Sequence, residues 1–146
     1  MNKVLIADST AGVPYIWPHH TNELILDRKD AEASEIMLTR IEPGEQCHRH
    51  LHTDNEQIYY IISGRGEIRY REPGAASDTA AELVPGQVVY IPCHTEHQTS
   101  CVGDQTLVYL GVDVFPRGKP ADELTWAAHA DALRRDTANE PEEGRS

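Results

Sequence analysis

Three histidines at alternate positions, His48, His50 and His52, are the residues of this 146-residue chain that are best suited to chemistry. In an extended strand, alternate side chains lie on one face, so this spacing predicts three imidazoles on a common face. Neutral imidazole is the commonest protein ligand for metals, and clustered histidines near an oxygen donor suit a first-row divalent ion. A histidine-rich surface loop is the alternative, but it gives no reason for the alternation. The spacing therefore predicts a metal site.

Two strand patterns accompany these histidines. The apolar run Ile58–Ile62 is rich in β-branched and aromatic residues and ends at Ser63-Gly64, which is typical of a buried strand that closes in a hairpin. A turn signal at Val84-Pro85-Gly86 precedes a second predicted strand, Gln87–Ile91, and His97 follows it closely.

These two stretches resemble the two motifs of the cupin superfamily. Gly44, five residues, His50, Leu51 and His52 resemble the first motif. Gly86, five residues, Pro92 and then His97 resemble the second motif. Two departures are His94, where the family usually carries glycine, and Cys101, which stands where asparagine is frequent. The resemblance covers about residues 36–114 and implies an all-β fold, a small jelly roll of two sheets.

The resemblance also implies a ligand set. Cupins normally place a glutamate three or four residues beyond the second histidine, followed by six residues and a glycine. Four residues separate His52 from Gln57 and six separate Gln57 from Gly64, whereas Glu56 fits only the shorter spacing and would point away by alternation. The implied ligands are His50, His52, Gln57 and His97, with Glu56 as the alternative fourth ligand.

Such a ligand set resembles the variant of cupins that open or rearrange unsaturated uronate sugars, and more loosely the cyclases of aromatic polyketides. Four neutral ligands leave a divalent ion (Zn, Ni, Fe or Mn) its full charge, which favours Lewis-acid chemistry over oxygen activation. The prediction is therefore an enzyme for ring opening, isomerisation or aldol-type cyclisation of a multiply oxygenated small molecule. His48 and Tyr59 are the predicted proton-transfer residues, because each shares a face with ligands. An Fe(II) or Ni(II) dioxygenase and a non-catalytic binding module are the alternatives.

The amino-acid composition limits the kinds of molecule that this protein is expected to bind and the compartment in which it is expected to occur. The net charge of −11 disfavours nucleic acid and anionic membrane surfaces. Three cysteines are an odd number without a framework spacing, and no apolar run is long enough for a signal peptide or a membrane span, so a cytoplasmic location is expected. Apolar residues on both faces of the strand at 57–62, together with Val4–Ala7, predict a homodimer.

The elements that position these residues divide the chain into four parts. Residues 1–34 are expected to form an N-terminal arm with edge strands at Val4–Ala7 and Asn22–Leu26, with a loop at 11–20 between them. Residues 35–115 are expected to form the cupin barrel. Residues 116–136 contain a predicted helix, Ala121–Arg135, with acids in its first turn and arginines in its last. Residues 137–146 have the composition of a disordered acidic tail.

Overall fold

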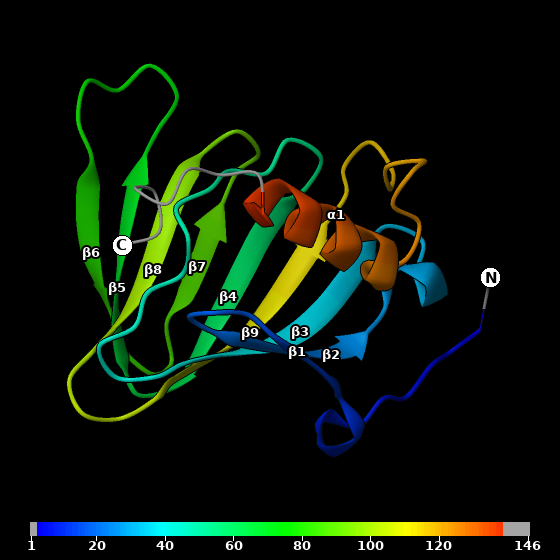
Figure 1. Ribbon diagram of the computed structural model, residues 1–146, viewed down its shortest axis with the longest axis horizontal. Helices are drawn as coiled ribbons and strands as arrows, with labels where there is room; N and C mark the ends of the chain where they lie inside the picture. The colour runs from blue at the N-terminus through cyan, green and yellow to red at the C-terminus, as the bar shows by residue number, and fades with distance from the viewer. Residues whose placement is uncertain (1–2, 139–146) are drawn as a thin grey trace.

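A computed structural model describes residues 3–138 of the chain. It contains two β-sheets and one C-terminal helix (Figure 1). The larger sheet has six strands in the order β1-β2-β3-β9-β4-β7, and the smaller has three in the order β6-β5-β8. Every pairing between neighbouring strands is antiparallel. The all-β jelly-roll class that the sequence predicted is confirmed.

The strands of the larger sheet are β1 (Val13–Ile16), β2 (Thr21–Leu26), β3 (Ser34–Ile41), β9 (Leu107–Val114), β4 (Glu56–Ser63) and β7 (Val88–Ile91). Those of the smaller sheet are β6 (Thr79–Leu83), β5 (Arg65–Arg71) and β8 (Glu96–Val102). The helices are η1 (Ser9–Ala11), η2 (Arg28–Asp30) and α1 (Trp126–Ala138).

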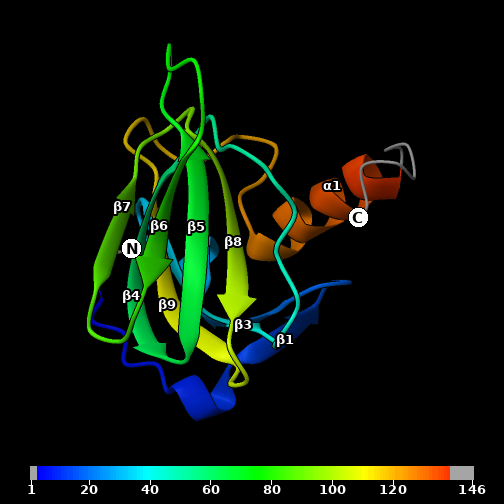
Figure 2. The same cartoon turned by 90° about the vertical axis from the view of Figure 1, so that its left-hand side faces the viewer.

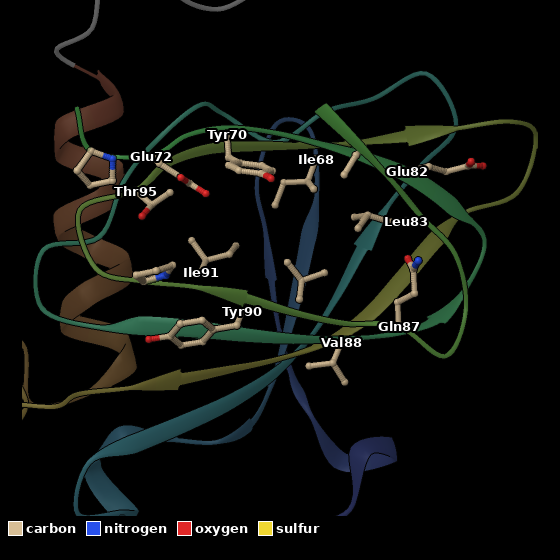
Figure 3. Close-up of a pocket in the computed structure, with 14 residues that line it drawn as sticks. Ile68, Tyr70, Glu72, Glu82, Leu83, Gln87, Val88, Tyr90, Ile91 and Thr95 are labelled. Carbon is tan, nitrogen blue, oxygen red and sulfur yellow. The ribbon is translucent and has the colours of Figure 1, made fainter. Parts of the chain in front are cut away.

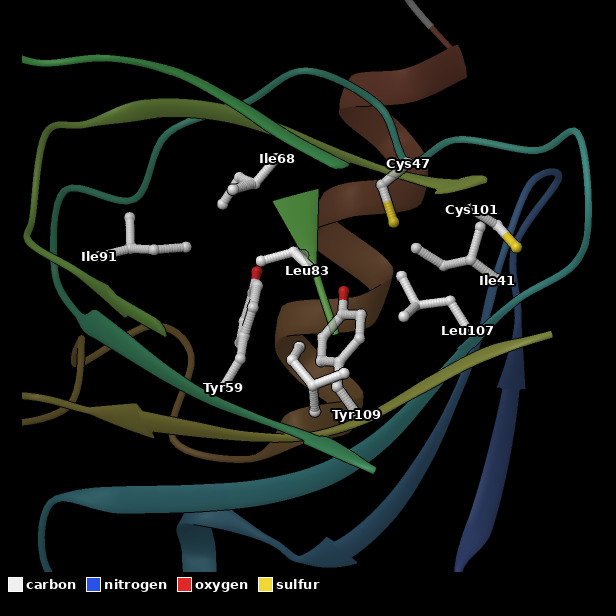
Figure 4. Close-up of a cluster of buried hydrophobic side chains, with 10 residues drawn as sticks. Ile41, Cys47, Tyr59, Ile68, Leu83, Ile91, Cys101, Leu107 and Tyr109 are labelled. Atoms are coloured by element: carbon white, nitrogen blue, oxygen red, sulfur yellow. The ribbon is translucent and has the colours of Figure 1, made fainter. Parts of the chain in front are cut away.

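The main core lies between the two sheets. In β3 and β8 buried and partly buried residues alternate along the strand, as expected when one face of each strand is turned inward. Figure 2 shows the smaller sheet, with β5 between β6 and β8, standing over part of the larger sheet. Figure 4 shows the side chains that fill the space between them: Ile41, Cys47, Tyr59, Ile61, Ile68, Leu83, Ile91, Cys101, Leu107 and Tyr109.

Helix α1 covers the rest of the inner face of the larger sheet. Trp126 and Ala130 of the helix pack with Leu24 of β2 and Met37 of β3. The start of the helix is held by Asp27, whose Oδ1 accepts a hydrogen bond of 3.0 Å from the backbone N–H of Trp126. The helix therefore begins at 126 and not at 121, because its capping oxygen comes from a distant segment.

Two local expectations for the N-terminal arm are wrong. Residues 13–16, expected in a loop, form the edge strand β1, whose Pro14 is tolerated because an edge strand needs no donor on its outer side. Residues 4–7, expected as an edge strand, have no secondary structure, and Val4 and Ile6 are exposed. The predicted tail lies largely outside the described residues. Among residues 3–138 no helix is long and apolar enough to cross a membrane.

The homodimer stays a prediction, and the outer face of the larger sheet is the surface we propose for it. Four large apolar side chains of β4 and β7 are exposed there: Tyr60, Ile62, Val88 and Tyr90. Tyr60 is paired with Val88 across the strands, so these side chains form a continuous patch.

We expect light scattering at micromolar concentration to give the mass of a dimer, and Tyr60→Lys to shift the measured mass toward that of the monomer. Thr79→Lys, at an exposed position of β6, is the matched control; a monomer mass for the wild type contradicts the prediction.

Candidate metal centre

Three histidines from two segments meet inside the barrel. The metal-binding ring nitrogens of His50, His52 and His97 all lie within 4.8 Å of one another. The ring centroids of His50 and His97 are 4.4 Å apart, and those of His50 and His52 are 4.8 Å apart. Two nitrogens bound to one zinc-like ion at ~2.1 Å lie at most ~4.2 Å apart, so small side-chain movements bring the set to ligand spacing.

The segment that carries His50 and His52 is irregular, and this corrects the expected strand. It is held along β8 by isolated bridges that pair Gln46 with Ser100 and His50 with His97. The backbone N–H of His50 donates to the carbonyl of His97 (3.1 Å), and that of His97 donates to the carbonyl of His50 (2.9 Å). This reciprocal pair of bonds places two of the candidate ligands side by side.

The three imidazoles are neutral and present free lone pairs. Burial lowers the pKa of His97 to about 4, and it also lowers the pKa of His50 and His52. The Nδ1 atoms of His50 and His97 donate to the carbonyls of His48 (2.6 Å) and Thr95 (2.9 Å), so the lone pair of each neutral ring is on Nε2. The Nε2 of His52 is buried and has no hydrogen-bond partner among the described residues. A bound cation would accept the unpaired lone pairs of these ring nitrogens.

Gln57 of β4 points its side-chain oxygen at the same place. Its Nε2 donates to Oδ1 of Asp113 (2.8 Å), and its Oε1 accepts from the hydroxyl of Tyr59 (2.9 Å). These two bonds orient the carboxamide, and its Oε1 then lies 3.1 Å from Nε2 of His97. Both of these atoms carry lone pairs, and with the His97 proton on Nδ1 no proton lies between them.

Two lone pairs that face each other at this distance repel unless a positive charge lies near them. The pKa of His97 is too low for a proton to take that role at neutral pH. A divalent ion bound by both atoms removes the repulsion, and imidazole nitrogen with amide oxygen is a suitable donor set for first-row metals. The residues present therefore fit a metal ion.

A series of buried polar side chains lies on the side of Gln57 that is away from the histidines. Asp113 of β9 is paired in register with Glu35 of β3, and both side chains are buried. Burial, opposed in part by Arg28, raises the pKa of Glu35 to about 8, with a further contribution from Asp113. Burial raises the pKa of Asp113 as well, and negative charge on either carboxyl disfavours ionisation of the other. Arg28 contacts Glu35 at 2.5 and 3.0 Å and offsets negative charge at this pair.

The other predicted site residues, Glu56, Tyr59 and His48, lie at different places relative to this cluster. Glu56 accepts a hydrogen bond of 2.6 Å from the Tyr90 hydroxyl, which lies on the outer face. The Tyr59 hydroxyl lies beside the cluster, but its proton is donated to Gln57. His48 is exposed, and its carbonyl oxygen accepts a hydrogen bond from Nδ1 of His50. The roles assigned to these side chains stay predictions.

Sequence reasoning missed several residues around the cluster. Glu35 and Asp113 carried a local signal, since each is an acid at an inward position of an apolar strand. The charge of His50 contributes to lowering the pKa of His20, and the charge of His129 contributes to lowering the pKa of His50 and His52, so both residues lie near the cluster. His129 is on α1, and no signal in the sequence around it indicates where the helix docks.

Two cavities open near the barrel. The larger, of about 690 Å³, lies between β6 and β7, where the two sheets are not joined, and apolar side chains such as Ile68, Leu83 and Ile91 line it (Figure 3). None of the clustered histidines lines it. The smaller, of about 180 Å³, is lined by Trp17, His20 and Arg40 among others, and His20 places it on the side of His50. The candidate metal ligands therefore lie outside the lining of the larger cavity.

Comparison with known proteins gives a family match. The family model of the cupin domain matches residues 37–115, more than half of the chain. Glucose-6-phosphate isomerase from Thermococcus onnurineus is 36% identical over 66 residues, which are 44% of this chain and 34% of that protein. The enzyme of the same name from Pyrococcus furiosus is 32% identical over 66 residues, with the same shares of both chains. The match spans about a third of the length of these relatives.

Solved structures share the fold over most of the chain. Oxalate decarboxylase from Lactobacillus farciminis, in a formate complex, has a TM-score of 0.66 at 19% identity, covering 94% of this chain and 41% of that one. KdgF from Halomonas sp. has a TM-score of 0.63 at 16% identity, covering 77% and 96%. The CENP-C cupin domain from Drosophila melanogaster has a TM-score of 0.66 at 10% identity, covering 74% of each chain. At these identities the likeness shows the fold alone.

Proposed function

This chain belongs to the cupin family, and from that premise we propose that it is an enzyme that uses one divalent metal ion as a Lewis acid. The reaction is non-redox chemistry on a multiply oxygenated small molecule, and the class that we favour is enolisation with isomerisation. The proposed ligands are His50, His52, Gln57 and His97.

The observation that carries this proposal is the neutral donor set. Three imidazoles whose pKa values are lowered by burial and one carboxamide oxygen bring no negative charge to the ion. When bound, the ion supplies undiminished polarisation of a carbonyl group, which acidifies the neighbouring C–H bond. Asp113 accepts from Nε2 of Gln57 and not from the oxygen that faces His97, and Glu35, which is paired with Asp113 across the strands, is bound by Arg28.

The comparisons support an enzyme of this general kind. The curated relatives are named as isomerases of a sugar phosphate, although the match covers only part of them. In this chain Arg28, Arg40 and Arg49 are each ion-paired, with Glu35, Glu23 and Asp78 respectively. We therefore propose a hydroxy-carbonyl substrate recognised by chelation and not by a phosphate group.

Solvent deuterium exchange tests the proposal. The protein is loaded separately with Zn²⁺, Mn²⁺, Ni²⁺ and Fe²⁺ and incubated in D₂O with an unsaturated uronate, fructose 6-phosphate and a β-diketone. We expect NMR to show metal-dependent deuterium at the carbon next to the carbonyl of at least one compound, with the non-phosphorylated compounds preferred. Oxygen consumption without exchange, or no reaction with any metal, contradicts the proposal.

A further inference from the structure

Helix α1 presents His129 on the face that packs against the barrel. Trp126 and Ala130 are both buried against Leu24 and Met37, and His129 lies three residues after the first and one before the second. Residues three apart on a helix are neighbours, and the rings of Trp126 and His129 are 5.5 Å apart. His129 is therefore on the buried side of the helix.

The segment with the ligand histidines is the next element on that side. In Figures 1 and 2 the chain between β3 and β4 runs between β8 and α1. His50 and His52 are in this chain segment, and Arg28, which donates to the carbonyl of Glu123, also donates to Glu35 behind Gln57. Helix α1 therefore lies beside the segment that carries two of the proposed ligands.

His129 is held by a carboxylate that is itself anchored. Its Nδ1 lies 2.8 Å from Oε2 of Glu123, and the two side chains are only 18% and 24% exposed. The carbonyl of Glu123 accepts a hydrogen bond of 3.0 Å from Arg28, whose side chain is fully buried. With Nδ1 engaged by Glu123, the Nε2 of His129 is the ring nitrogen that can accept a proton from another group.

An unpartnered polar atom lies beside this pair. The indole Nε1 of Trp126 is buried and has no hydrogen-bond partner among residues 3–138. A buried N–H without a partner carries a desolvation cost, which a bound hydroxyl or carbonyl oxygen relieves. The wall formed by α1 therefore offers a base, its orienting carboxylate and a free donor, which together suit an oxygenated ligand.

We propose that His129, oriented by Glu123, is the catalytic residue that moves the proton in the reaction proposed above, and the inference rests on that proposed function. His129 Nε2 takes the proton from the carbon next to the substrate carbonyl. The electron pair of that C–H bond forms the carbon–carbon double bond of an enediolate as the carbonyl π pair moves onto the carbonyl oxygen, and Glu123 stabilises the imidazolium that forms. His129 then returns the proton to the former carbonyl carbon, while the hydroxyl proton of the neighbouring carbon moves to the former carbonyl oxygen. The hydroxyl and carbonyl groups thus exchange places, and the step needs no oxidant or further reactant.

The two proton-transfer residues expected from the sequence are less suited to this step. The Tyr59 proton is donated to Gln57, and burial raises the pKa of its hydroxyl. The side chain of His48 is exposed to solvent. Tyr59 is thus a positioning residue for Gln57, whereas His129 is paired in the manner of a general base.

The kinetic test uses conservative variants in the metal-loaded protein, with the substrate and metal identified by deuterium exchange. His129→Gln is expected to lower kcat by ~100-fold or more while leaving metal content and KM nearly unchanged, since general acid–base catalysis contributes ~10²–10⁴-fold. Glu123→Gln is expected to give a smaller loss. Asp131→Asn, on the exposed side of the same helix, is the matched control and should retain full activity. Full activity of folded His129→Gln overturns the inference, whereas an inactive wild type overturns the proposed function.

A second measurement does not depend on turnover. The protein is loaded with Zn²⁺ or with paramagnetic Co²⁺, and the imidazole resonances of His129 are identified by their absence in His129→Gln. We expect these resonances to be strongly shifted or broadened by Co²⁺ relative to Zn²⁺, because the ring lies near the ion. Unchanged His129 resonances in a Co²⁺-loaded protein overturn the inference even if the enzyme is active.

Discussion

Replacing His97 with alanine is expected to lower the metal affinity by ~10-fold or more and to abolish the metal-dependent reaction. The side chain is almost fully buried, and its Nε2 lies 3.1 Å from the oxygen of Gln57. The substitution removes one donor and leaves a void that water fills without restoring the rigid geometry. Elemental analysis after dialysis, together with titration of a divalent ion into metal-free protein, measures the change.

Two further variants make this prediction decisive. The double variant His50→Ala/His97→Ala should carry no metal, because only one histidine of the cluster remains. His19→Ala is the matched control, since His19 is exposed and its ring is paired with Glu45. Full metal occupancy in the double variant would show that the ion binds elsewhere.

Replacing Gln57 with glutamate is expected to keep or tighten metal binding while lowering kcat by ~10-fold or more, which corresponds to ~1.4 kcal/mol. The added negative charge reduces the polarising power of the ion. It also removes the amide N–H that donates to Asp113, so two carboxyls then face each other at about the present 2.8 Å contact. The metal-free variant should therefore be less stable than the metal-free wild type, as measured by thermal unfolding.

Glu56→Gln is the control for this substitution. Glu56 contacts the Tyr90 hydroxyl and not the histidine cluster, so metal content and kcat should be unchanged. If Glu56→Gln loses the metal while Gln57→Glu behaves as wild type, the fourth ligand is Glu56. The neutral donor set, and with it the preference for non-redox chemistry, would then be refuted.

Several strand positions were predictable because their signals are local. Turn residues and the alternation of side chains along a strand depend on neighbouring residues, so the positions of β2, β4 and β7 could be predicted within a few residues. The same local signal predicted which of Gln57 and Glu56 faces the cluster. Adjacent residues of one strand point to opposite faces, and the structure places Gln57 inward and Glu56 on the side of Tyr90.

Where local signals conflicted with packing, prediction failed. The segment around His50 has the alternation of a strand, but reciprocal backbone bonds to His97 hold it in an irregular path. Consequently His50 and His52 join the cluster, whereas the His48 side chain is exposed. Val13–Ile16 was missed because a proline and nearby polar residues hide an edge strand, whose identity depends on pairing with β2.

By itself, the sequence indicated the cluster of His50, His52 and His97 through its resemblance to the cupin motifs, and strand alternation indicated that Gln57 and not Glu56 faces it, since motif spacing and alternation are short-range properties. Only the tertiary structure decided what surrounds them. Asp113 meets Gln57 and Glu35 through the register of β9 with β4 and β3. His129 approaches the cluster because Asp27 and Arg28 anchor α1 from a segment about 100 residues away. Such contacts depend on how distant elements dock, and no local pattern encodes that docking.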